Sequence, residues 1–282
     1  MSIKDKGYRI LLAVVLPGLE YVHSRVSDSV SLRLENVIAR LRGRQVRFSS
    51  DSLSSDFIAS ERGRRRYFEI KQRGFWCYRA GLLSRAEFIS KSYCLSHVKF
   101  SESDIVIDCG ANAGDLFLAL SGCIEPGNYI AIEPNPSDFR ILSKNVPDCR
   151  RLNEALGNRI GEIEFFVCTE KGDSSIIEPE SYSERVKVHM TTLDELIRRM
   201  QISKVKLLKI EGEGFEPEIL EGAHSALCAC EFVAVDGGYE RGIDGDQTFT
   251  EVTNFLVRRG FRMVDVYFPW CRALFVNNHY AA

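Results

Sequence analysis

The sequence predicts an α/β fold: a Rossmann-like, mostly parallel sheet with helices on both faces and an antiparallel hairpin at its C-terminal end. Two observations predict this class. From residue 105 onward, short apolar runs typical of buried strands alternate with segments of helical spacing. Strands that alternate with helices build parallel sheets covered on both faces. A glycine-containing segment at 108–114 also follows the first of these strands and opens a helix, where sheets of this class bind ligands.

The length of the chain indicates one domain with an extension. It has 282 residues, 45% of them hydrophobic and 27% charged, which is the composition of a globular protein and excludes a disordered chain. We expect residues 101–282 to form the sheet domain and residues 1–100 an N-terminal basic and aromatic extension that is partly helical. The net charge of −2 gives no general attraction to nucleic acid, so no nucleic-acid partner is expected.

The N-terminal 100 residues give weaker signals. The apolar run at 10–16 is shorter than the roughly 20 residues of a spanning helix, so we expect a short helix packed on the protein or lying at a membrane interface. Helical spacing at 22–41 predicts a helix. The Ser- and Asp-rich segment 49–60 predicts a loop, and the aromatic and basic segment 65–83 predicts a pair of strands.

Basic residues dominate from 33 to 85, with a cluster at 62–66. Such a block suits an anionic substrate or the inner face of a membrane, and it equally suits a solvated surface. The sequence leaves these alternatives open.

The sheet domain is predicted element by element from apolar periodicity and from capping residues. Asn135 with Pro136 starts one helix, the capping box from Thr192 to Glu195 starts another, and Gly260 ends the last. Strands are predicted at 105–108, 129–133, 150–155, 162–168, 186–190, 205–210, 232–236, 261–268 and 272–277, and helices at 112–120, 135–142, 193–197, 216–227 and 249–259.

The nine cysteines include no Cys-x-x-Cys pair, and several of them lie in predicted core elements. We therefore expect reduced thiols, a cytoplasmic location and no metal site.

The segment 108–114 carries the first functional signal. Gly110 permits a tight turn and close approach of a ligand, and Gly114 permits close packing of the helix. The spacing Gly-x-x-x-Gly is a poor cradle for a pyrophosphate, which requires a further glycine. It suits a nucleoside that carries no phosphate.

Glu133 ends the second predicted strand, 19 residues after Gly114. A carboxylate at this position can accept hydrogen bonds from both hydroxyls of a ribose. Asn153 and Ala155 end the third strand, where they either border an adenine ring or form a plain turn.

Acidic residues crowd the end of the strand at 205–210, on the same edge of the sheet. Repulsion in a dry site could raise the pKa of one carboxyl toward neutrality and make it a general base. Glu211 is the first candidate and Asp236, at the end of the next strand, is the second. His189 precedes the capping box and is a third candidate for a catalytic role.

With these residues in view, the stretch from about 105 to 225 resembles the FkbM-type family of S-adenosylmethionine-dependent methyltransferases. The resemblance rests on five segments in the order of that family: 106–114, 133–135, 153–157, 191–194 and 208–223. Glu211 stands where the family has Asp, and Gly212 stands where it has Val. Residues 1–100 lie outside the resemblance.

The resemblance implies a Rossmann-like methyltransferase fold that binds S-adenosyl-L-methionine and methylates a hydroxyl of a sugar, polysaccharide, glycolipid or related natural product. The residues it would assign to the cofactor are Asp108, Gly110, Asn112, Gly114, Glu133, Pro134, Asn135, Asn153 and Ala155.

Two other functions are weighed against this one. A nicotinamide-dependent oxidoreductase uses a similar sheet but requires the glycine that this loop lacks. A non-catalytic scaffold would have no need to keep Asp108, Gly110 and Glu133 together, and fold alone does not decide between these functions.

Overall fold

The computed structural model describes residues 23, 25–168 and 174–280. The chain divides into two compact units, residues 1–82 and residues 83–282. The second unit contains every residue that the sequence analysis assigned to a site.

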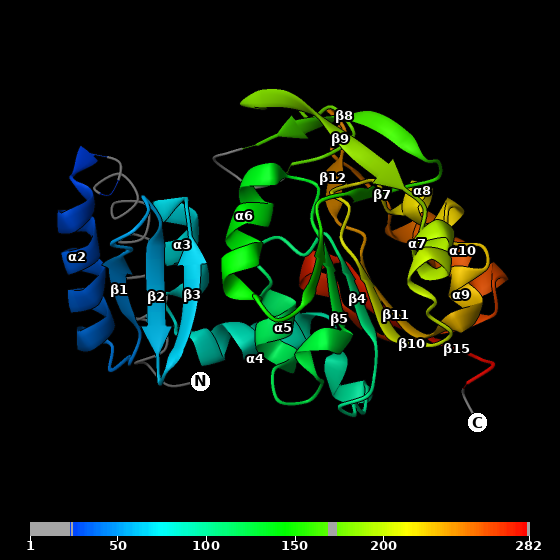
Figure 1. The fold of residues 1–282 in the computed structure, drawn as a ribbon, viewed down its shortest axis with the longest axis horizontal. Coiled ribbons are helices and arrows are strands. Elements are labelled where there is room, and N and C mark those ends of the chain that lie inside the picture. The colour runs from blue at the N-terminus through cyan, green and yellow to red at the C-terminus, as the bar shows by residue number, and fades with distance from the viewer. Residues whose placement is uncertain (1–22, 24, 169–173, 281–282) are drawn as a thin grey trace. The chain divides into compact units, whose positions relative to one another are not determined.

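The second unit is built on a seven-stranded sheet in the order β14-β15-β11-β10-β4-β5-β6. The five strands from β11 to β6 are parallel, whereas β15 runs antiparallel to β11 and to β14. The strands are β4 (Val106–Cys109), β5 (Tyr129–Ile132), β6 (Arg150–Leu152), β10 (Val205–Ile210), β11 (Cys230–Asp236), β14 (Phe261–Tyr267) and β15 (Arg272–Asn277). The predicted fold class, including the C-terminal hairpin, is confirmed (Figure 1).

Alternating side chains of each strand pack into different hydrophobic cores on the two faces of this sheet. Ile107 of β4 belongs to one core and Val106 to the other. The helices of this unit are α4 (Leu82–Ser92), α5 (Asp115–Leu120), α6 (Pro136–Asn145), α7 (Leu193–Met200), α8 (Glu216–Glu221), α9 (Ala226–Ala229) and α10 (Phe249–Arg258). Side chains of α4, α5 and α6 fill the core that contains Val106, and side chains of α7 to α10 fill the core that contains Ile107.

Local sequence explains where these helices begin. The Thr192 side chain accepts a hydrogen bond from the backbone N–H of Glu195 at 3.1 Å, and the Asn135 side chain caps α6 in the same way through Ser137. The helix predicted at 216–227 is interrupted after Glu221, so α8 and α9 are separate short helices.

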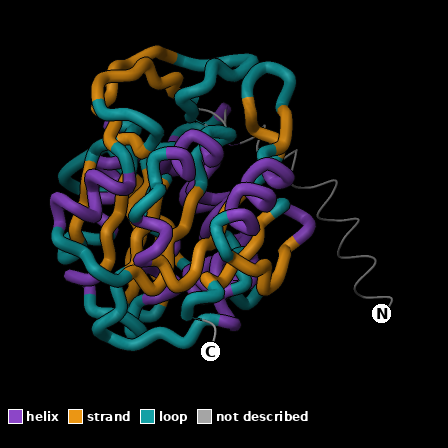
Figure 2. Tube along the Cα trace, turned by 90° about the vertical axis from the view of Figure 1, so that its right-hand side faces the viewer, coloured by secondary structure: helices purple, strands orange, loops and turns teal. Residues whose placement is uncertain are grey.

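Two small β-sheets complete the second unit. One contains β7 (Ala155–Leu156), β9 (Glu184–Thr191) and β8 (Gly161–Val167), and the other pairs β12 (Tyr239–Arg241) with β13 (Asp246–Gln247). Figures 1 and 2 show the sheet of β8 and β9 at the top, beyond the carboxyl ends of the parallel strands. It therefore lies at the edge where the candidate site residues gather.

The described part of the first unit contains two helices and a three-stranded antiparallel sheet. It contains α2 (Asp28–Leu41), β1 (Arg47–Ser50), β2 (Phe57–Glu61), β3 (Arg64–Phe68) and α3 (Lys71–Tyr78). Phe48, Phe68 and Phe75 pack edge to face in its core. Buried Glu35 accepts hydrogen bonds from Arg79 at 2.6 and 2.9 Å, which keeps its charge paired.

Two predictions for this unit were wrong. In the segment 49–60 only the Ser- and Asp-rich centre at 51–56 is loop, because residues 49–50 belong to β1 and residues 57–60 belong to β2, where Phe57 and Ala59 alternate as buried residues. The segment 65–83 contains one strand and then helix α3, because Phe75 and Tyr78 lie three residues apart and bury one face of a helix.

No helix among residues 23, 25–168 and 174–280 is long and apolar enough to cross a membrane. The apolar run at 10–16 lies outside the described residues. The nine cysteines all lie within them, and none of them forms a disulfide in the structure.

Candidate functional site

The turn after β4 depends on glycine for a steric reason. Gly110 has φ +72°, and a Cβ atom placed on it would lie 2.0 Å from the backbone oxygen of Glu211. The chain leaving β10 therefore crosses directly against this turn, and only glycine leaves room for it. Gly114 has φ +83° and caps α5, which starts at Asp115 rather than at the predicted residue 112.

Glu133 directly follows β5, and backbone amides hold its carboxylate. Its Oε2 accepts a hydrogen bond from the N–H of Asn112 at 2.8 Å, and its Oε1 accepts one from the N–H of Asn135 at 2.9 Å. The side chain is only 5% exposed. Burial raises its pKa to about 8, the charge of Asp138 adds to this, and the two amide hydrogen bonds oppose it.

The remaining residues predicted on this side support the loops around Glu133. The Asn153 side chain donates to the backbone oxygens of Glu133 and Pro134 at 2.8 and 3.1 Å. Asn135 caps α6, and Ala155 is buried on β7, paired with Met190. These residues hold the chain that presents Glu133.

Lys209 of β10 is the first of two buried cations at this edge of the sheet, on the side of β4 that faces away from Glu133. Its Nζ lies 3.1 Å from Oδ1 of Asp108 and 2.8 Å from Oε2 of Glu211, and it donates to the backbone oxygen of Gly110 at 2.7 Å. Asp108 is itself buried and accepts a further hydrogen bond from the hydroxyl of Tyr129. Burial opposes the charge on Lys209, but the two carboxylates outweigh it and hold its pKa above the ordinary value.

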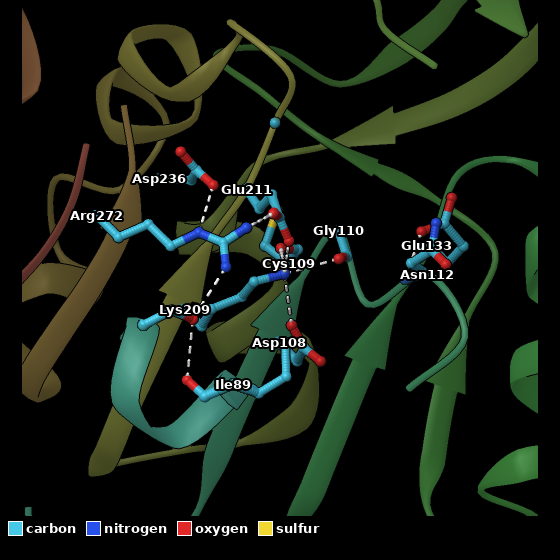
Figure 3. A network of polar contacts seen from close by, with 12 residues as sticks. Ile89, Asp108, Cys109, Gly110, Asn112, Glu133, Lys209, Glu211, Asp236 and Arg272 are labelled. Carbon is cyan, nitrogen blue, oxygen red and sulfur yellow. Dashed lines mark hydrogen bonds and ion pairs between the residues drawn. The ribbon is translucent and has the colours of Figure 1, made fainter. Parts of the chain in front are cut away.

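Arg272, the first residue of β15, is the second cation. Its Nε lies 2.6 Å from Oδ2 of Asp236, and its two terminal nitrogens contact Glu211 at 2.7 Å and Ser92 at 3.0 Å. Its guanidinium lies over the ring of Tyr93, 4.4 Å from the centroid. Figure 3 shows Arg272 and Lys209 meeting at Glu211 from two different strands.

These contacts decide the charge of the two acidic candidates. Burial would raise the pKa of Glu211, but Lys209 and Arg272 outweigh it and hold the pKa well below the ordinary range. Asp236 differs, because burial raises its pKa to about 6 against the opposing charge of Arg272. Glu211 is therefore a permanently charged partner of two cations and a weak acceptor of protons near neutral pH.

The loop after Glu211 is fixed by Glu216. Its Oε1 accepts hydrogen bonds from the backbone N–H groups of Gly212 and Gly214, and its Oε2 accepts one from the hydroxyl of Thr248. Burial raises the pKa of Glu216, so this carboxyl serves as a buried brace for the loop.

The third catalytic candidate lies elsewhere. His189 is exposed on β9, opposite Glu162, between the buried residues Val188 and Met190. Because successive side chains of a strand point to opposite faces, its ring points away from the core that those two residues fill. The structure brings Glu211 and Asp236 together through Arg272 but does not bring His189 to them.

Sequence reasoning missed Arg272 and Tyr93 and did not assign a role to Lys209. Arg272 lies 61 residues after Glu211 in an ordinary hairpin, and Tyr93 follows a helix outside every motif. The one available signal was the position of Lys209, two residues before Glu211 and between the apolar residues Leu208 and Ile210, where a buried cation requires partners.

Comparison with protein families gives one match that spans 55% of the chain: residues 108–263 match the family described as the methyltransferase FkbM domain. A curated relative, the hexuronic acid methyltransferase AglP of Haloferax volcanii, is 28% identical over 145 residues, which is 48% of this chain and 56% of that protein. The chain thus spans about half the length of the curated relative that it matches.

Solved structures resemble the chain more distantly. A methyltransferase FkbM from Methylobacillus flagellatus is 16% identical, with a TM-score of 0.44 over 64% of this chain and 45% of that one. A TehB-like methyltransferase from Corynebacterium glutamicum is 12% identical, with a TM-score of 0.37 over 70% of this chain and 97% of that one.

Proposed function

The chain belongs to the FkbM methyltransferase domain family, a family of S-adenosylmethionine-dependent methyltransferases, and we propose that it transfers the methyl group to a hydroxyl of a sugar. The predicted cofactor, S-adenosyl-L-methionine, agrees with this family. The sugar acceptor is our proposal, as are the residues that we assign to donor and acceptor.

The arrangement of Glu133 carries the proposal, because it suits the adenosine part of the cofactor. Each of its two carboxylate oxygens accepts one backbone amide and keeps capacity for a second hydrogen bond. Two adjacent ribose hydroxyls would supply those second hydrogen bonds. The turn at Gly110 packs directly against the backbone of Glu211, and its Gly-x-x-x-Gly spacing lacks the further glycine of a pyrophosphate-binding loop, which agrees with a nucleoside that carries no phosphate.

The charge of the site also suits this donor. Five carboxyl side chains gather at this edge against the two cations: Glu211, Glu213, Glu216, Asp236 and Glu240. A cationic sulfonium and an ammonium group would be attracted to such a surface.

When bound, the cofactor supplies an electrophilic methyl group on a positively charged sulfur. The work of the protein is then alignment of the acceptor oxygen, which can contribute about 7–11 kcal/mol, and removal of its proton, worth about 10²–10⁴-fold. Lys209 and Arg272 fix the ends of β4, β10, β11 and β15 relative to one another, so they give the site the rigidity that alignment requires.

A carbohydrate acceptor is supported by the curated relative, whose name states that it methylates a hexuronic acid. We propose a sugar of a polysaccharide or glycolipid as the acceptor class. The experiment is a transfer assay with radiolabelled S-adenosylmethionine and a panel of sugar glycosides, preceded by calorimetric titration of S-adenosylmethionine and of NAD.

We expect S-adenosylmethionine to bind, NAD to give no heat, and label to enter a glycoside. Binding of NAD in place of S-adenosylmethionine would contradict the proposed function and favour an oxidoreductase. Transfer of the label only to lipid-free protein or to nucleic acid would contradict the proposed sugar acceptor and would leave the proposed methyl transfer in place.

We further propose that the N-terminal unit brings the protein to an anionic surface such as the inner face of a membrane. Residues 1–82 carry 16 Lys and Arg against 8 Asp and Glu, a net charge of +8, whereas residues 83–282 carry 21 against 31, a net charge of −10. Co-sedimentation with phosphatidylserine vesicles should weaken as salt rises. Absent or salt-independent binding would contradict this proposal.

A further inference from the structure

The edge of the sheet at the carboxyl ends of its parallel strands has two halves with different side chains. Only one half is needed to bind the nucleoside. Glu133 and the turn at Gly110 follow β5 and β4, whereas Asp236 ends β11 and Arg272 begins β15 on the other side of β10. If the adenosine occupies the first half, the acceptor must approach the second.

Glu240 is a further carboxyl group of this second half, close to Asp236. It is half-buried on β12, and within the described ranges it makes no ion pair. A Cβ atom placed on Gly238 would lie 3.3 Å from Oδ1 of Asp236 and 3.4 Å from Oε1 of Glu240, so both carboxyls flank this glycine.

The hairpin that carries Glu240 is fixed to the rest of the edge. The neighbouring Arg241 forms an ion pair with Glu218 at 2.6 Å and donates to the backbone oxygen of Gly214 at 2.5 Å. Glu240 is therefore presented from a braced position.

An exposed aromatic surface lies beside these carboxyls, in the turn between β14 and β15. Phe268 is 78% exposed and Trp270 is 38% exposed. The guanidinium of Arg272 lies 4.9 Å from the centroid of the Trp270 ring. The backbone N–H of Gly237 donates to the oxygen of Cys271 at 3.1 Å, which ties this turn to the chain between Asp236 and Glu240.

This combination suits a pyranose ring. The faces of such a ring carry C–H groups that pack on an indole, while its hydroxyls lie at the ring edge and donate to carboxylates. Above about pH 8, where Glu240 is charged together with Glu211 and Asp236, the carboxylates of this edge exceed its two cations, so an uncharged hydroxyl would enter this site more readily than the carboxylate of a uronic acid.

We propose that the acceptor sugar stacks on Trp270 and that Glu240 takes the proton of its reacting hydroxyl. This inference rests on the proposed function and deepens it. The acceptor oxygen gives its proton to the Glu240 carboxylate and forms a bond to the methyl carbon. The bond from that carbon to sulfur breaks, its electron pair stays on sulfur, and the sulfonium charge is neutralised as a thioether and an ether form.

Glu211 and Asp236 are less suited than Glu240 to accept the proton of the reacting hydroxyl. Glu211 is paired with Lys209 and Arg272, and Asp236 is paired with Arg272 and accepts the N–H of Gly238 at 3.1 Å. Burial raises the pKa of Glu240 to about 8, and the charge of Asp236 adds to this. A base with this pKa is well matched to a reaction near neutral pH.

The charged and titratable groups that face Glu240 come from several elements. They are Asp236 after β11, Glu211, Glu213 and Glu216 around the loop before α8, and Cys271 in the turn before β15. Most are acidic, so turnover should rise with pH as Glu240 ionises, with an apparent pKa near 8.

The part of the proposal in which the sugar stacks on Trp270 has a direct test by fluorescence. The chain has two tryptophans, Trp76 and Trp270. In the full-length Trp76→Phe variant, all indole emission comes from Trp270. We expect saturable quenching by methyl β-glucopyranoside in the presence of S-adenosylhomocysteine, and weaker quenching by methyl β-glucopyranosiduronic acid. Absence of a response to either glycoside would overturn this half.

The proton-transfer half is tested with Glu240→Gln, and Asp244→Asn on the same hairpin is the matched control, because Asp244 is exposed. We expect Glu240→Gln to lower kcat about 10²–10⁴-fold, to remove the rise of kcat near pH 8 and to leave donor affinity unchanged. The control should keep the rate and the pH profile of the wild type.

Two results would overturn the proton-transfer half while leaving the proposed function in place. One is an unchanged kcat and pH profile in Glu240→Gln. The other is a product that is a base-labile methyl ester, because an acceptor carboxylate needs no base. Failure of the wild type to bind S-adenosylmethionine would instead overturn the proposed function itself.

Discussion

The two halves of the sheet edge hold their carboxylates by different means. Glu133 is held by two backbone amides, whereas Glu211 is held by the charged side chains of Lys209 and Arg272. The amides leave the pKa of Glu133 raised to about 8, while the two cations lower that of Glu211. A buried carboxylate at a strand end can thus be a binding group or a structural ion, and its partners decide which.

The largest expected effect comes from removing a cation from the half of the edge that contains Glu211. Lys209→Met would leave Asp108 and Glu211 without their shared cation in a buried place. We expect the free energy of unfolding to fall by about 3–5 kcal/mol, measured by chemical denaturation. Lys204→Met removes an exposed partner of Glu231 and should cost about 0–1 kcal/mol. Equal losses in the two variants would contradict the structural role of the buried ion pairs of Lys209.

The raised pKa of Glu133, in the half held by backbone amides, predicts how the stability of the protein depends on pH. The folded pKa of Glu133 is about 8 and its ordinary value is 4.5, so the folded chain keeps a proton that the unfolded chain releases. Its contribution is full below about pH 4.5 and is lost as the pH rises through 8, a change of up to about 5 kcal/mol.

Glu240, with a pKa of about 8, and Asp236, with a pKa of about 6, act in the same direction. Thermal unfolding of the ligand-free protein should therefore show a falling Tm from pH 5 to pH 8. Glu133→Gln should flatten this slope. A Tm that rises over the same interval would show that Glu133 is ionised when free of ligand.

A third prediction concerns donor binding. Glu133→Gln should weaken the binding of S-adenosylmethionine about 10–100-fold, because a hydrogen bond to a charged group contributes about 1.5–3 kcal/mol. Calorimetry at pH 8.5 measures this where the wild-type carboxyl is largely ionised. Glu125→Gln, on the exposed turn before β5, is the control and should bind as the wild type does. Unchanged affinity in Glu133→Gln would remove Glu133 from the donor site.

The smallest expected effect is that of removing the charge of Glu211, and it tests whether Glu211 is the base. Glu211→Gln leaves Lys209 with Asp108 and Arg272 with Asp236. Because the pKa of Glu211 lies far below neutrality, the rise of kcat with pH should persist in this variant, and it should move to a lower pH because the charge of Glu211 helps to raise the pKa of Glu240. A pH profile that loses this rise would make Glu211 the base and would place Glu240 in a supporting role.

Much of the second unit could be predicted from local sequence. The alternation of apolar strands with capped helices gave the sheet, and Asn135 and Thr192 cap the helices that their positions predict. In the first unit the same reasoning predicted only the helix at 22–41, of which α2 covers Asp28–Leu41, and it did not predict the packing of β2 and α3. Phe57 and Phe75 reveal their burial only when β2 and α3 pack together, and the segment around Phe75 has no strong helical pattern of its own.

By itself, the sequence determined the sheet, the turn at Gly110 and the placing of Glu133 at the end of β5, because each of these depends on neighbours close in the chain. The tertiary structure decided the state of Glu211, whose cationic partner Arg272 lies 61 residues away, and brought Glu240 beside Asp236 across a hairpin. The charge and pKa of a buried group depend on every charged atom within a few ångströms, and only the folded chain determines which atoms those are.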